Sequence, residues 1–187
     1  LWCSNIGLSI LMATINLLPD ADISNDWTLS TGSDVFALLD DNATLIGVDA
    51  FRITATAATK ECTLTFQDFS EDFSSIDSVQ AVIRAGNNGR GRSFKIQSTI
   101  FDNTSSLYVE NSALQTASTT YKTITYTNRT TSDGSSAWTN SNINNLRMKI
   151  ELSMHSGGTT SCTYCYFIIT YTEPVATDNS LFFGCNF

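Results

Sequence analysis

Residues 146–154 read LRMKIELSM, and this stretch decides the fold. Apolar side chains occupy every second position from Leu146 to Met154, and polar or charged side chains stand between them. A period of two is that of a β-strand with one buried face, because successive side chains of a strand point to opposite sides. The stretch therefore predicts a strand that packs one face on a core.

The same character extends along the chain. Six further runs are rich in Thr, Ile, Val, Tyr and Phe, which suit pleated sheets, and they span 50–57, 62–66, 79–85, 93–101, 119–127 and 163–172. Turn-forming Asn, Asp and Gly separate many of them, and helical spacing is nearly absent. We expect an all-β protein, an antiparallel β-sandwich of immunoglobulin-like or jelly-roll type. At 187 residues, one domain is the natural size.

Composition excludes several classes of function. Charged residues make up 15% of the chain, the formal net charge is −8, and Ser and Thr supply about a quarter of the residues. A net negative charge opposes binding to nucleic acid or to an anionic membrane. No uninterrupted apolar run approaches the length that spans a bilayer, so we expect no membrane insertion.

The first 19 residues form the most informative segment. Ile6, Leu8, Ile10 and Met12 stand at alternate positions, and the segment ends at Pro19. We predict an N-terminal strand arm over residues 1–19 and a β-sandwich domain over 20–187. An apolar strand of this kind can complete the sheet of a neighbouring copy, can be the first strand of its own sandwich, or can be an extension without a role.

A local basic patch stands out on the acidic chain. Arg84, Arg90, Arg92 and Lys95 surround the turn GNNGRGR. Such a patch could pair with an acidic surface of a neighbouring subunit, or it could be a solvated hairpin tip.

Five cysteines, an odd number, leave at least one thiol free or paired between chains. Cys162 and Cys165 form a C-x-x-C within a β-rich run, and residues three apart on a regular strand point to opposite faces. We therefore expect buried thiols or disulfides to other strands in place of a zinc site, and we predict no metal and no cofactor.

Catalysis has little support in the sequence. The single histidine, His155, lies beside a Gly-Gly turn without a nucleophile motif. Acidic residues cluster near 20–26, 40–41 and 68–77, where solvated loops are the simplest explanation, although a carboxylate pair or a calcium loop is conceivable. Trp27, Trp138 and several tyrosines fit core packing or a sugar-binding surface.

Three longer stretches carry a resemblance to a known family. They are MATINLLPDADISNDWTLSTG at 12–32, SDGSSAWTNSNINNLRMKIEL at 132–152 and FIITYTEP at 167–174. Together they resemble the β-sandwich structural proteins of aquatic phage virions, which implies a non-enzymatic, multimeric role such as head decoration or tail. The arm before Met12 is similar to the donor strands of pilus-like fibrils.

These observations predict a non-enzymatic structural subunit. We expect it to join copies of itself into an extracellular, pilus-like filament by strand exchange through Ile6, Leu8, Ile10 and Met12. A virion structural protein is the close alternative. A carbohydrate-binding module is the competitor of a different class, and a glycan is the partner it would take.

Overall fold

The structure is a computed structural model, and it describes residues 11–40, 52–88, 93–102, 106–116 and 121–174. The strands are β1 (Met12–Leu17), β2 (Pro19–Asn25), β3 (Thr28–Leu29), β4 (Ile53–Ala55), β5 (Glu61–Phe66), β6 (Ser75–Asn87), β7 (Ser93–Asp102), β8 (Ser106–Asn111), β9 (Gln115–Thr116), β10 (Lys122–Thr125), β11 (Leu146–His155) and β12 (Thr160–Thr172). Two short helices are α1 (Phe36–Leu39) and α2 (Asn140–Asn144). In these ranges no helix has the length and apolar character needed to cross a bilayer.

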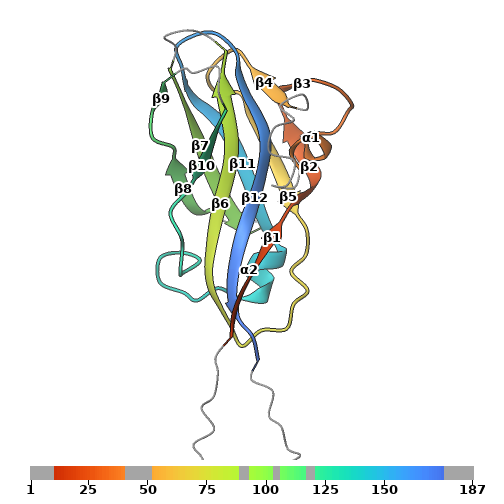
Figure 1. Cartoon of the computed structure of the whole chain (residues 1–187), viewed down its shortest axis with the longest axis vertical. Helices are drawn as coiled ribbons and strands as arrows, with labels where there is room; N and C mark the ends of the chain where they lie inside the picture. The colour runs from red at the N-terminus through yellow and green to blue at the C-terminus, as the bar shows by residue number, and fades with distance from the viewer. Residues whose placement is uncertain (1–10, 41–51, 89–92, 103–105, 117–120, 175–187) are drawn as a thin grey trace, which may run out of the picture.

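The strands form two antiparallel sheets that face each other (Figure 1). Sheet A has the order β10–β6–β12–β4–β3, and β1 also pairs with β12. Sheet B has the order β2–β5–β11–β7–β8, and β9 also pairs with β7. The expected antiparallel β-sandwich is confirmed, and each of the six β-rich runs contains a strand.

The strand predicted at 146–154 is β11, in the middle of sheet B. Leu146, Met148, Ile150 and Leu152 are at most 2% exposed and belong to the core. Met154 is 41% exposed, although the alternation predicted it to be buried. The reason is a β-bulge, because the register against β7 shifts between Leu152 and Met154.

A second bulge shapes β12, the long central strand of sheet A. The pairing with β6 shifts between Cys162 and Tyr164, so Thr163 is an extra residue. The extra residue moves the residues that follow it to the opposite face of the strand. As a result, both Cys162 and Cys165 point into the core at 0% exposure. The prediction that these two residues point to opposite faces was wrong, because it assumed an unbroken strand.

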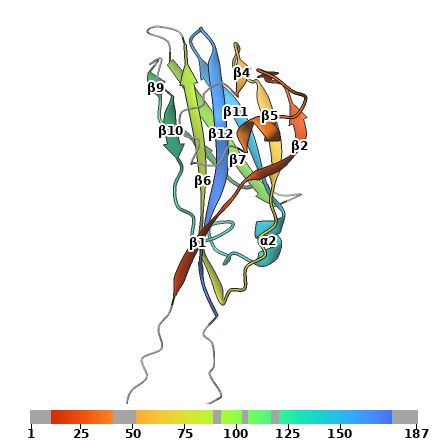
Figure 2. The same cartoon turned by 45° about the vertical axis from the view of Figure 1, so that its right-hand side comes forward.

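The chain changes sheet between β1 and β2. Leu17 ends β1 in sheet A, and Pro19 begins β2, an edge strand of sheet B. Proline suits the first residue of an edge strand, because it has no N–H to donate to a ladder. β1 lies beside the C-terminal end of β12 at one end of the elongated sandwich in both views (Figures 1 and 2).

The two tryptophans pack in the core, and a capping box begins α2. Trp27 and Trp138 are 3% and 4% exposed, which confirms core packing for both. The indole Nε1 of Trp138 donates to the carbonyl of Arg129 at 2.9 Å. Thr139 begins α2 with a capping box, in which its hydroxyl accepts from the N–H of Asn142.

Candidate functional site

The described part of the predicted arm contains the strand β1. Met12–Leu17 pairs antiparallel with β12 of the same chain, from Met12 opposite Thr172 to Leu17 opposite Phe167. These residues are thus a strand of their own sandwich, which is one of the arrangements that the sequence left open. The predicted domain boundary at residue 19 therefore falls after a strand that already belongs to the fold.

The two faces of β1 differ. Leu17 is 1% exposed, and Ala13 and Ile15 pack against the core. Met12, which has the opposite parity, is 62% exposed, and Leu11 beside it is 57% exposed. The apolar alternation at Ile6, Leu8 and Ile10 shares the parity of Met12, although those three residues lie outside the described ranges.

One long side of the sandwich is open between the edge strands β8 and β10. Within the described residues, each pairs on one side only, β8 with β7 and β10 with β6. A cavity of about 410 Å³ lies between them. Its lining residues are Glu110, Asn111, Ser112, Ala113, Gln115, Thr123, Ile124, Thr125, Tyr126 and Thr127.

The backbone of β10 presents unused groups to this open side. The N–H of Tyr126 donates to the carbonyl of Ala81 in β6 at 3.0 Å. In an antiparallel pair, hydrogen-bonded residues alternate with residues whose main-chain groups point away. Thr123 and Thr125 therefore direct their N–H and C=O groups toward the open side.

Glu110 bridges the two sheets at one end of the opening. Its carboxylate accepts from the N–H of Thr127 at 3.0 and 3.1 Å and from the Thr127 hydroxyl. Arg129 lies 3.9 Å from the same carboxylate and 4.8 Å from the ring centroid of Tyr108. Burial raises the pKa of the Tyr108 hydroxyl, so this residue stays neutral.

The predicted basic patch is divided between the two sheets. Arg84 lies in β6 of sheet A, and its guanidinium is 5.7 Å from the ring centroid of Tyr121. Lys95 lies in β7 of sheet B, between the buried residues Phe94 and Ile96, so it faces outward from the other sheet. Arg90 and Arg92 lie outside the described ranges. The two described members thus do not share a surface.

Three thiols meet in the core. Cys62 of β5 and Cys162 and Cys165 of β12 are free and 0% exposed. Burial raises the pKa of all three, and the two thiols of β12 raise that of Cys62 further. Within the described part of the chain, no three His, Cys, Asp or Glu side chains are arranged to hold a metal ion.

The acidic residues and the histidine have structural contacts. Asp22 accepts from the N–H groups of Val35 and Phe36 at 2.5 and 2.7 Å, at the start of α1. Asp20 accepts from the hydroxyl of Thr65 at 2.5 Å. His155 ends β11 and is half-buried, and its Nδ1 lies 3.4 Å from the hydroxyl of Thr160.

Sequence reasoning missed the open side. Neither β8 nor β9 was among the predicted runs, and the position of β10 beside β8 depends on how the sheets stack. The alternation in SLYVEN at 106–111 was the available signal for β8.

Comparisons with known proteins give structural similarities of low TM-score. No family model and no curated protein matches the chain. Among solved structures, it is similar to the CBM36-1 domain of a multidomain xylanase from the hindgut metagenome of Trinervitermes trinervoides. That match has 10% identity and a TM-score of 0.40, over 84% of this chain and 96% of that one. A structure described as "CBM4 structure and function" matches at 10% identity and a TM-score of 0.33, over 64% and 78%.

Proposed function

We propose that this protein is a non-catalytic structural subunit that assembles with copies of itself into an extracellular filament. The surface of a virion is the alternative assembly. The observation that carries the proposal is the outward, 62% exposed side chain of Met12 on a strand whose other face is buried. The sequence continues the alternation of apolar residues from Met12 back to Ile10, Leu8 and Ile6.

The open edge of β10 is the surface that we propose receives the arm. An added strand gains main-chain hydrogen bonds from the outward N–H and C=O groups of Thr123 and Thr125. The cavity between β8 and β10 provides room for its side chains. Unpaired edges are sites where strands from other chains add readily.

The positions of donor and acceptor favour a chain of subunits. β1 and β10 lie on opposite sides of the β6–β12 pair in sheet A. A contact from one patch to a different patch is heterologous, and it propagates into a filament unless the rotation closes a ring. The same contact between subunits would therefore give either a filament or a closed ring on a virion.

The arm is tested by deletion and by two matched substitutions. We expect the full chain to form filaments or rings in electron microscopy and a chain without residues 1–10, which keeps β1, to elute as a monomer. Leu8→Asp places a charge at one of the alternating apolar positions and should also give monomers. Ser9→Asp places the same charge at a position between the alternating apolar residues, and this variant should still assemble. Equal assembly of all four chains, or none by the full chain, contradicts the proposal.

The acceptor is tested at Thr125. Proline has no N–H and is tolerated on the outer side of an edge strand, so Thr125→Pro should fold and yet fail to receive a strand. Thr125→Ala keeps the N–H and should assemble. If Thr125→Pro folds and assembles as well as Thr125→Ala, β10 is not the acceptor, even where the arm deletion has abolished assembly.

A further inference from the structure

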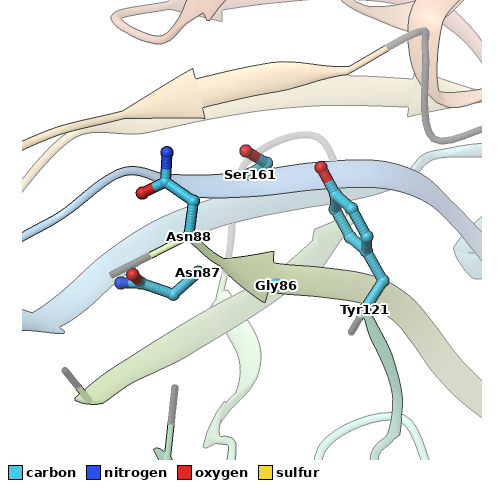
Figure 3. A pocket seen from close by; sticks show the side chains of 5 residues that line it. All are labelled: Gly86, Asn87, Asn88, Tyr121 and Ser161. Atoms are coloured by element: carbon cyan, nitrogen blue, oxygen red, sulfur yellow. The ribbon is translucent and has the colours of Figure 1, made fainter. Parts of the chain in front are cut away.

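A second site lies on the outer face of sheet A, near the end of β10. Gly86 of β6 pairs with Ser161 of β12, and Tyr121 immediately precedes β10. With Asn87 and Asn88 they line a cavity of about 80 Å³ (Figure 3). Figure 1 looks onto this sheet, and neither helix crosses β6 and β12 there.

The ring of Tyr121 lies directly over Gly86. A Cβ at position 86 would come within 3.1 Å of Cδ1 and 3.3 Å of Cα of Tyr121, so a larger residue would require Tyr121 to move by a few tenths of an ångström. The guanidinium of Arg84 lies 5.7 Å from the centroid of the same ring. Tyr121 is half-buried, and it directly precedes β10.

Three polar groups around the cavity are not used by the fold. Asn88 accepts from the N–H of Thr159 at 2.8 Å through Oδ1, which leaves its Nδ2 group as a donor. Ser161 is 7% exposed, and in the described ranges neither its hydroxyl nor that of Tyr121 makes a hydrogen bond. Figure 3 shows these three side chains pointing to the same side of the sheet.

Asn87 shows the contrast. Its Nδ2 donates to the hydroxyl of Thr160 at 3.1 Å and to the carbonyl of Gly157 at 3.3 Å. In Figure 3 its side chain points away from the other three. Asn87 therefore supports the strand ends, whereas Asn88, Ser161 and Tyr121 are available to a ligand.

We propose that this cavity binds one pyranose ring of a saccharide. An aromatic ring offers an apolar face to the C–H groups of a sugar, and neighbouring hydroxyl and amide groups can bond its hydroxyls. The Ser161 hydroxyl borders the cavity, so a ligand hydroxyl can hydrogen-bond to it in place of water. The cavity is much smaller than a site that encloses a drug-sized ligand, so it takes one edge of a single ring.

The charge of the protein favours a saccharide over a polyanion. The net charge of −8 opposes polyanions such as nucleic acid. A single shallow ring site predicts weak binding, on the order of millimolar. Repetition of the site in an assembly would strengthen attachment through avidity, but the binding itself does not depend on the proposed assembly.

The experiment uses saturation-transfer difference NMR on the full chain, a method that tolerates large assemblies. The probes are the methyl pyranosides of glucose, galactose, mannose, xylose and N-acetylglucosamine. We expect transfer to at least one of them, and we expect Tyr121→Ala to abolish it. Ser161→Ala, which breaks no bond of the fold, should weaken binding about tenfold, as loss of one hydrogen bond does.

Tyr166→Ala is the matched control. Tyr166 is a half-buried tyrosine in β12 that lies beside Tyr164 and outside the cavity. This variant should bind as the unaltered chain does, and thermal unfolding checks that each variant is folded. Absence of transfer to every probe overturns the proposal, as does equal binding by Tyr121→Ala or Ser161→Ala and the unaltered chain.

Discussion

Thr163 is the extra residue of the bulge in β12, and it decides which way two cysteines point. Its hydroxyl is buried and has no hydrogen-bond partner among the described residues. Three positions earlier, the hydroxyl of Thr160 accepts from the amide of Asn87 at 3.1 Å in the buried interior. Two threonines on one strand thus differ in what their hydroxyls do.

Valine substitutions of Thr163 and Thr160 measure what each hydroxyl contributes to stability. Thr163→Val removes an unpaired buried hydroxyl and should leave stability unchanged or raise it by up to about 1 kcal/mol. Thr160→Val breaks a buried hydrogen bond and should lower the free energy of unfolding by about 1–2 kcal/mol. Urea unfolding monitored by tryptophan fluorescence measures both. A greater loss of stability for Thr163→Val than for Thr160→Val would show that the Thr163 hydroxyl has a partner.

Asp133 organises its turn through its carboxylate. It accepts from the N–H groups of Ser136 and Ser135 at 2.6 and 2.9 Å and from both hydroxyls. These bonds, the N–H of Ser136 first, hold the pKa of the carboxyl well below its usual value near 3.8. Because the folded pKa is depressed, this interaction is present above the unfolded pKa and is lost as the pH falls through the folded one.

We therefore expect the Asp133 carboxyl to remain ionised below pH 3.8. Carbon-detected NMR titration of its side chain measures the midpoint. Ser136→Ala removes one hydroxyl donor but keeps the N–H, so the midpoint should rise only part of the way. A midpoint in the unaltered protein at or above the usual value would contradict the turn geometry.

At the scale of the element, the buried and the outward face of β11 contribute differently to stability. Met148 is 0% exposed between the sheets. Its neighbour Lys149 faces outward, where it contacts Glu61 at 3.1 Å and Glu151 at 3.5 Å. The bond to Glu61 raises the pKa of Lys149 above its usual value.

Alanine at these two positions should have unequal effects. Met148→Ala leaves a cavity in the core and should cost about 2–5 kcal/mol. Lys149→Ala loses partly exposed ion pairs and should cost about 1 kcal/mol or less. Chemical denaturation of both variants measures the difference. Equal losses would mean that β11 does not present one face to the core.

At the scale of the whole molecule, the packing of the two sheets on each other buries three thiols. Cys62 comes from one sheet, and Cys162 and Cys165 come from the other. A thiol reacts as the thiolate, and burial both raises the pKa and blocks access. Reactivity therefore reports on whether the two sheets stay together.

We expect iodoacetamide at pH 8 to leave these three cysteines unmodified in the native protein and to modify them in denaturant. Peptide mass spectrometry after labelling identifies each site separately. Rapid native labelling of Cys162 or Cys165 would mean that the sheets open or that β12 lacks the bulge at Thr163.

The sequence by itself determined the class of fold and the inner face of β11, because a half-buried strand shows its burial as an alternation with period two. It also placed most long strands, whereas it left the tryptophans open between the core and a sugar-binding surface. It did not determine the bulges, because one inserted residue changes the parity of a strand without a local signal, as at Thr163 and before Met154. Strand pairing also depends on contacts between distant residues, so only the tertiary structure decided where β1 lies, that Arg84 and Lys95 face opposite ways, and that β8 and β10 leave a side open. The pocket at Tyr121 has the same origin, since Gly86, Tyr121 and Ser161 meet only when β6, β10 and β12 are assembled.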